Sequence, residues 1–200
     1  MPSIREEVER LREYEDVVEI GEIARRLFAM NSFDGILTIL GVLVGTYLAE
    51  VRVPQVIIVT GLATSVSMGV SGLWGAYLTE SAERQKSLDD LECMTLTDLT
   101  NTRIGRASRA AVVIVALVDG LAPLLASALV LLPFFLTNLW GDITYSYYLA
   151  LALAMVGLFG LGVFLGRTSK QSMVIAGLKT LVAGVVALVL SFLIEGAIPG

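Results

Sequence analysis

Histidine is absent from this 200-residue chain, and cysteine occurs once, at Cys93. The lack of histidine excludes His-ligated metal sites, Ser-His catalytic triads and HExxH chemistry. A single cysteine cannot form an intramolecular disulfide or a CxxC metal site. With these constellations excluded, we predict that the protein is not an enzyme.

Charged residues are also scarce. They make up 16% of the chain, while hydrophobic residues reach 56%, and a soluble domain has about 25% charged residues. The mean hydropathy is +0.78. This composition is typical of an integral membrane protein. The net charge of −5 and the pI of about 4.8 argue against nucleic acid as a partner.

Five apolar runs are long enough to cross a bilayer. They lie at residues 27–49, 54–79, 110–136, 144–166 and 172–195. The sequence therefore predicts an all-α integral membrane protein with five transmembrane helices. Lysine and arginine fall almost entirely on one side of these runs, since only Arg52 lies in a segment on the opposite side. By the positive-inside rule, the N-terminus is cytoplasmic and the C-terminus is outside.

Residues 1–26 form the first predicted region, a cytoplasmic amphipathic helix. Ser3 and Glu6 match a capping box, and apolar residues recur after them at helical spacing. We expect this helix to lie against the membrane or a partner. Metal gathering is the alternative role, and its ligands would be Glu15, Asp16, Glu19 and Glu22. Residues 27–200 form the predicted five-span membrane domain, with a cytoplasmic acidic loop at 80–109.

That loop carries several candidate metal ligands at helical spacing. They are Glu80, Glu83, Asp89, Asp90, Glu92 and Met94. If the segment is helical, residues three or four apart present carboxylate and thioether ligands on shared faces. A solvated acidic helix accounts for the same charges equally well, so both interpretations stand.

Four side chains within the apolar runs are candidates for a transport path. They are Asp34, Met68, Asp119 and Lys179, each on a different run. Their estimated depths are about 12 to 18 Å from the nearest cytoplasmic charge, from the rise of an α-helix per residue. Charged groups at such depths are expected to face the bundle interior and to pair. The alternative is a structural salt bridge between Lys179 and one of the two aspartates, which would leave the other protonated, hydrated or cation-bound.

Glycine and proline predict how the helices pack. Gly41 and Gly45 form a GxxxG pattern, as do Gly162 and Gly166, and such patterns pack helices within a chain or between chains. Two prolines lie inside the third run, Pro123 and Pro133. We expect them to break or kink that helix and to open backbone carbonyls toward a cavity.

Four motifs occur in a fixed order along the chain. They are FDGILTILGVLVG in the first run, SVSMGVSG in the second, DGLAPLLASALVLLPF in the third and GLKTLVAGVVALVLSFLIEG in the fifth. Together, over residues 33–195, they resemble the vacuolar iron transporter family, five-span carriers that move ferrous iron or manganese out of the cytosol. The resemblance implies that Asp34 and Met68 lie on the ion path, that Lys179 occupies the place of a basic residue, and that the protein is a homodimer.

The chain departs from the family pattern in two places. The Gly-Glu that follows the Ser-Met pair in the family reads Ser71-Gly72 here, so that glutamate is absent, and Glu80 or Glu83 is a candidate to replace it. The cytoplasmic segment is also shorter than in plant members. These departures indicate a divergent, prokaryotic branch, and hence a prokaryotic plasma membrane.

We therefore predict an exporter of Fe2+ or Mn2+ from the cytosol that works by proton antiport. Carboxylates suit both ions, and the Met68 thioether adds preference over Mg2+ and Ca2+. Asp34 would bind the cation when ionised and carry a proton when protonated. The expected partners are the lipid bilayer, divalent metal ions, protons and a second copy of the chain, with no tightly bound cofactor. Two rival interpretations are a non-transporting membrane scaffold with structural buried charges and a carrier of an organic cation.

Overall fold

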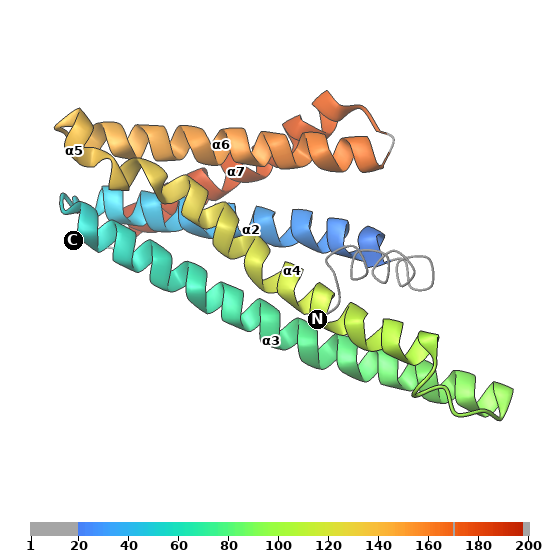
Figure 1. Ribbon diagram of the computed structural model, residues 1–200. Coiled ribbons are helices and arrows are strands. Elements are labelled where there is room, and N and C mark those ends of the chain that lie inside the picture. Colours follow the sequence, from blue (N-terminus) through green and yellow to red (C-terminus); the bar gives the residue numbers. More distant parts are fainter. Residues whose placement is uncertain (1–19, 170, 198–200) are drawn as a thin grey trace. The chain divides into compact units, whose positions relative to one another are not determined.

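The computed structural model describes residues 20–169 and 171–197, and every regular element among them is helical (Figure 1). The helices are α2 (Ile20–Leu48), α3 (Pro54–Thr95), α4 (Arg103–Phe135), α5 (Thr137–Trp140), α6 (Ile143–Thr168) and α7 (Met173–Ala197). Five of them, all except α5, are long and apolar enough to cross a membrane. The prediction of an all-helical chain with five such helices is confirmed for these residues.

Local sequence accounts for several helix ends. Pro54 takes the first position of α3, where a backbone N–H would have no intrahelical partner in any case. Asp142 caps α6, because its side chain accepts a hydrogen bond from the backbone N–H of Thr144 at 2.8 Å. Gly141 ends α5 at φ 72°, a left-handed conformation that glycine adopts without strain. These turns separate α5 from α6.

Helix α3 continues well past its apolar part. It has 42 residues, which correspond to a length of about 63 Å. The segment that we expected to be a loop at 80–109 is therefore helical up to Thr95 and again from Arg103, with residues 96–102 as the connector (Figure 1). Hydropathy marks only where the apolar run stops. Most of residues 80–95 are Glu, Leu, Arg, Lys, Gln, Met or Ala, which have high helix propensity, so the helix continues.

Two other predictions concern the continuity of helices. Most of the predicted N-terminal helix, residues 1–19, lies outside the described residues, and residues 20–26 are continuous with the rest of α2. The boundary at residue 26 stays a prediction. Helix α4 runs through both of its prolines and is not broken by them. The carbonyl of Pro123 accepts a hydrogen bond from the Ser127 hydroxyl, and the carbonyl of Pro133 accepts one from Ser146 at 3.1 Å.

The chain divides into two compact units. Within the described residues, the first unit comprises 20–28 and 70–121, and the second comprises 29–69 and 122–197. Helices α2, α3 and α4 contribute to both units, whereas α5, α6 and α7 belong to the second alone.

The core of the second unit is apolar and centred on α2. Its fully buried side chains include Ile39, Leu40 and Leu43 of α2, Ile57 of α3, Leu131 and Phe134 of α4, and Tyr147 and Leu158 of α6. The Tyr147 ring meets Phe134 edge-on at a centroid distance of 5.0 Å, and its hydroxyl donates to the Val51 carbonyl at 3.0 Å. This hydrogen bond satisfies the polar end of a ring that is otherwise buried.

Helix α7 packs along α6 through small residues. A Cβ on Gly166 would lie 2.8 Å from the Cβ of Ala176, and Gly162 is likewise covered by α7. The Thr180 hydroxyl donates to the Leu158 carbonyl at 2.8 Å, which joins the two helices. The GxxxG pattern at 162–166 therefore serves packing within the chain.

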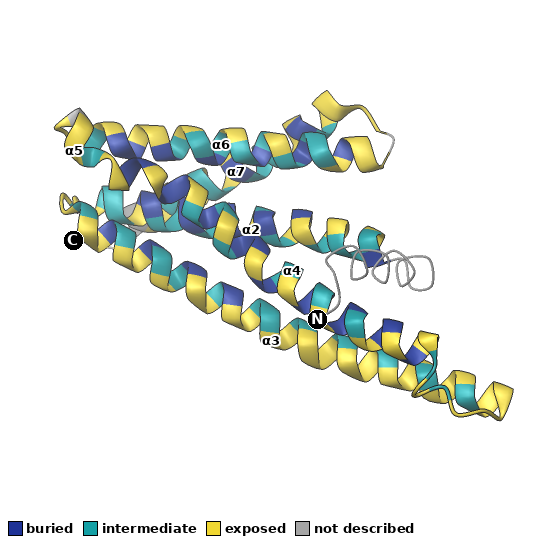
Figure 2. Cartoon of the chain, viewed as in Figure 1, coloured by how far each residue is buried: buried dark blue, intermediate teal, exposed yellow. Residues whose placement is uncertain are grey.

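The other GxxxG pattern is open. A Cβ on Gly41 or on Gly45 would meet nothing within 4 Å. Exposed apolar side chains also cover most of α7, and only 11% of its most apolar window is buried. Helix α3 is exposed along much of its length as well (Figure 2). Such surfaces are those expected of helices that face lipid or a second subunit.

The first unit contains the connector and the helical segments on either side of it. The Glu92 carboxylate accepts a hydrogen bond from the Leu99 N–H at 2.7 Å and one from the Thr100 hydroxyl at 3.3 Å, which fixes the turn. The Thr100 N–H donates to Asp98 at 2.8 Å, and this bond lowers the pKa of the Asp98 carboxyl from its ordinary value. Gly105 allows α4 to start here, because a Cβ on it would lie 2.5 Å from the Leu99 carbonyl.

Candidate functional site

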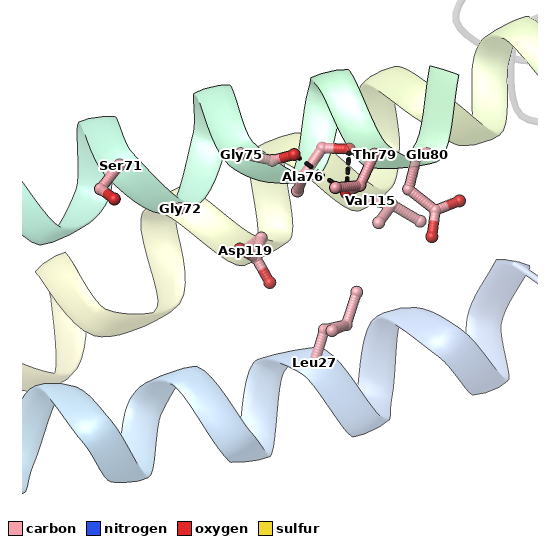
Figure 3. A pocket seen from close by; sticks show the side chains of 9 residues that line it. All are labelled: Leu27, Ser71, Gly72, Gly75, Ala76, Thr79, Glu80, Val115 and Asp119. Atoms are coloured by element: carbon pink, nitrogen blue, oxygen red, sulfur yellow. Dashed lines mark hydrogen bonds between the residues drawn. The ribbon is translucent and has the colours of Figure 1, made fainter. Parts of the chain in front are cut away.

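The first unit contains an open cavity of about 230 Å³ between segments of α2, α3 and α4 (Figure 3). Its walls are Leu27 from α2, Val115 and Asp119 from α4, and Ser71, Gly72, Gly75, Ala76, Thr79 and Glu80 from α3. The space is large enough for several water molecules or a hydrated ion.

The wall from α3 explains why there is room. Its residues form adjacent pairs at 71 and 72, at 75 and 76, and at 79 and 80, so they repeat every four positions and share one face of the helix. All of them except Glu80 are glycine, alanine, serine or threonine. Small side chains along one helix face leave a cavity that large ones would fill.

Asp119 supplies a carboxylate from α4. Its side chain is half-buried, and it lies against the backbone of Gly72 across the cavity wall (Figure 3). A Cβ on Gly72 would lie 3.1 Å from the Asp119 Oδ2 and 2.9 Å from the Asp119 carbonyl oxygen. Both oxygens therefore face α3. Pro123 follows four residues later in α4 and has no N–H, so it cannot donate the usual helical hydrogen bond to this carbonyl.

Glu80 supplies the second carboxylate. Its Oε2 accepts from the Arg84 Nε at 3.0 Å, and the two side chains are 26% and 14% exposed. The neighbouring Thr79 hydroxyl donates to the Gly75 carbonyl at 2.9 Å (Figure 3). That arrangement turns the Thr79 oxygen into an acceptor for any further donor or cation. All three side chains thus offer oxygen.

The two carboxylates lie at different levels of the cavity. Asp119 contacts α3 at Gly72, and Glu80 lies eight residues further along the same helix, about 12 Å by helical rise. They are too far apart to chelate one ion together. Within residues 20–169 and 171–197 there is also no cluster of three or more His, Cys, Asp or Glu side chains that could hold a metal ion. Asp119 and Glu80 are therefore two separate oxygen sites in one cavity.

Three of the four residues predicted to line a transport path lie outside this cavity, in the second unit. Met68 is half-buried on α3, while Asp34 on α2 and Lys179 on α7 are exposed. No ion pair links Asp34 with Lys179 in the described chain. The expectation that these charges face the interior of a bundle is therefore wrong for the single chain. Counting residues gives the depth of a side chain but not its direction around the helix axis.

The candidate metal ligands in the part of α3 from Glu80 to Thr95 fall into two groups. Glu80, Asp89 and Glu92 are engaged locally, since Asp89 accepts from the Gln85 amide at 2.9 Å, Glu80 bonds Arg84 and Glu92 fixes the connector. The second group, Glu83, Asp90 and Met94, is exposed. Its members are spaced by seven and four residues, so they share one helix face. Their role in metal capture stays a prediction.

Sequence reasoning named Asp119 and Glu80 but did not bring them together. It also did not give Ser71, Gly72, Gly75 or Thr79 a role at a site. The available signal was the recurrence of small residues in pairs every four positions from 71 to 79, ending at a glutamate.

Comparison with known proteins identifies a relative. The chain is 32% identical over 180 residues to the uncharacterized protein MJ0645 of Methanocaldococcus jannaschii, and the match covers 88% of this chain and 91% of the relative. The chain belongs to the MJ0645 family. No family model matches the chain. No solved structure matches it either.

Proposed function

We propose that the protein is a membrane transporter that exports Fe2+ or Mn2+ from the cytosol in exchange for protons. The observation that carries this proposal is the cavity in which Asp119 and Glu80 form successive oxygen sites with the Thr79 hydroxyl. Carboxylate and hydroxyl oxygens are suitable ligands for Mn2+ and Fe2+. The resemblance of four motifs to vacuolar iron transporters supports the same substrate class.

The exchange needs carboxylates that alternate between a cation and a proton. Asp119 lies ten residues past Arg109, the last basic residue before the apolar part of α4. We propose that Asp119 and Asp34 take this role and that Glu80 receives the ion at the cytoplasmic mouth. The N-terminus is cytoplasmic and the C-terminus outside in this proposal, in agreement with the positive-inside rule.

A homodimer is part of the proposal. Asp34 is exposed on α2, within an apolar helix, and a charged carboxylate facing lipid costs at least several kcal/mol, very roughly. Gly41 and Gly45 follow Asp34 at spacings of seven and eleven residues, so they lie on the same face, and both are open. A second copy packed on this face would give Asp34 a protein environment. The small residues would allow the close approach that helix pairs in membranes need.

The test is cation flux into vesicles that contain the purified protein, with a pH-sensitive dye inside. We expect entry of Mn2+ or Fe2+ to be accompanied by proton movement in the opposite direction. Asp119→Asn and Asp34→Asn should abolish both fluxes, because they keep the volume of the side chain and remove its titratable charge. Asp142→Asn is the matched control, since it makes the same change at a helix cap, where asparagine also serves.

Three outcomes would contradict the proposal. Absence of any metal flux would favour the membrane scaffold. Flux of an organic cation without flux of metal would favour the organic-cation carrier. Full activity in Asp119→Asn would remove the cavity from the transport path.

A further inference from the structure

The close contact between Gly72 and Asp119 sets where the carboxylate lies. The position of a Cβ on Gly72 is 2.9 Å from the Asp119 carbonyl oxygen, 3.1 Å from Oδ2 and 3.2 Å from the carbonyl carbon. Close C–H···O contacts in proteins fall at about 3.3–3.6 Å between carbon and oxygen. Any side chain at position 72 would therefore displace the carboxylate, the α4 backbone or both.

Gly75 lies one turn further along the same wall and makes no such contact. It also lines the cavity, but a Cβ on it would meet nothing within 4 Å. Alanine at either position adds the same methyl group to the same wall, and only at position 72 does that group press on Asp119. Comparing alanine variants at the two glycines therefore distinguishes displacement of Asp119 from a simple loss of cavity volume.

We infer that Gly72 is a positioning residue for Asp119, and this inference rests on the proposed transport role of the cavity. Gly72 exposes bare backbone at the point where α3 and α4 approach. The Asp119 carboxylate and carbonyl can then both lie against α3, at the cavity wall, and meet a cation there as a pre-formed oxygen pair. The carbonyl belongs to the backbone and cannot rotate away from an added methyl group, so relief requires movement of α4. That movement carries the carboxylate with it.

Mn2+ binding to the full-length protein in detergent tests this inference, with free Mn2+ measured by its electron paramagnetic resonance signal. We expect Gly72→Ala to weaken binding by roughly 10–100-fold, the usual effect of losing a group that orients a metal ligand. Gly75→Ala should weaken it far less. Gly160→Ala, at an exposed and open site on α6, should bind as the parent protein does. Far-UV circular dichroism and the thermal transition show whether each variant is folded.

A rescue variant distinguishes positioning from general packing. Asp119→Glu in the Gly72→Ala background adds one methylene, which lets the carboxylate reach back from the displaced α4. Partial recovery of Mn2+ affinity supports the inference, whereas a purely structural role of Gly72 predicts no recovery. Equal losses in Gly72→Ala and Gly75→Ala would overturn the inference, because cavity volume would then explain both.

The inference and the proposed function fail in different ways. If Asp119→Asn weakens Mn2+ binding and Gly72→Ala does not, the inference is wrong and the transport proposal stands. If Asp119→Asn leaves binding unchanged, the cavity is not a cation site and both are wrong. Should Gly72→Ala not fold, the parent protein gives the answer by nuclear magnetic resonance. Mn2+ must then broaden the Gly72 amide signal at lower concentration than the Gly105 signal, and the reverse order would overturn the inference.

Discussion

Gly35, next to Asp34, is a residue at which a single methyl group should disturb the second unit strongly. A Cβ on Gly35 would lie 2.6 Å from the Pro123 carbonyl oxygen and 2.8 Å from the Pro123 Cα. Both atoms belong to the backbone of α4, which cannot move aside by a change of rotamer. The crossing of α2 and α4 thus explains why a glycine follows Asp34.

The magnitude follows from two opposing terms. Alanine in place of glycine inside a helix gains about 1 kcal/mol from helix propensity. Overpacking costs typically 1–3 kcal/mol, and we take about 3 here because backbone must shift. Gly35→Ala should therefore lower the free energy of unfolding by about 2 kcal/mol. Gly160→Ala, which meets nothing within 4 Å, should raise it by up to about 1 kcal/mol.

Gly61→Ala provides an intermediate case. Its Cβ would lie 2.7 Å from the Cδ1 of Leu131, but a leucine side chain can adjust, so the loss should fall between the other two. The assay is unfolding by sodium dodecyl sulfate in mixed micelles, followed by far-UV circular dichroism. The reasoning is refuted if Gly35→Ala proves as stable as Gly160→Ala, because the α2–α4 crossing would then be looser than the structure shows.

Three further predictions concern the ends and surfaces of the helices. A reporter fused after Gly200 should be extracytoplasmic and one inserted near Leu96 cytoplasmic, and finding both on one side would overturn the five-span topology. Replacing the exposed residues Glu83, Asp90 and Met94 by Gln, Asn and Leu should weaken metal binding without loss of folding, because solvated charges contribute little stability. Unchanged binding would mean that residues 80–95 of α3 are only a solvated acidic helix. The Asp98 pKa is lowered in the folded chain by the hydrogen bond from the Thr100 N–H. The stability that this bond gives the connector is therefore fully present above the ordinary carboxyl pKa of 3.8. It is lost as the pH falls through the lower pKa of the folded chain. Amide hydrogen exchange at Thr100, corrected for its intrinsic pH dependence, should lose protection in that range, and an Asp98→Asn variant should not show the same pH dependence.

Much of the architecture could be predicted from local sequence. Five runs of apolar residues predicted five helices of spanning length because a helix in lipid must satisfy its own backbone and present apolar side chains over about 30 Å. Pro54 predicted the start of α3 for an equally local reason. The end of α3 could not be found in this way, since hydropathy falls at Glu80 while helix propensity continues to Thr95.

The direction in which each side chain points depended on packing. Asp34, Asp119 and Lys179 looked equivalent in the sequence, as charges inside apolar runs. Packing exposed Asp34 and Lys179, and it placed Asp119 against Gly72 in a cavity. Rotation of a helix about its axis is set by which small residues allow a neighbour to approach, and that depends on residues far away in the chain. The sequence by itself determined which segments are helices that can span a membrane and which charges they carry. Only the tertiary structure decided that Asp119 and Glu80 share a cavity, because that requires segments of α2 and α4 to pack against the small-residue face of α3.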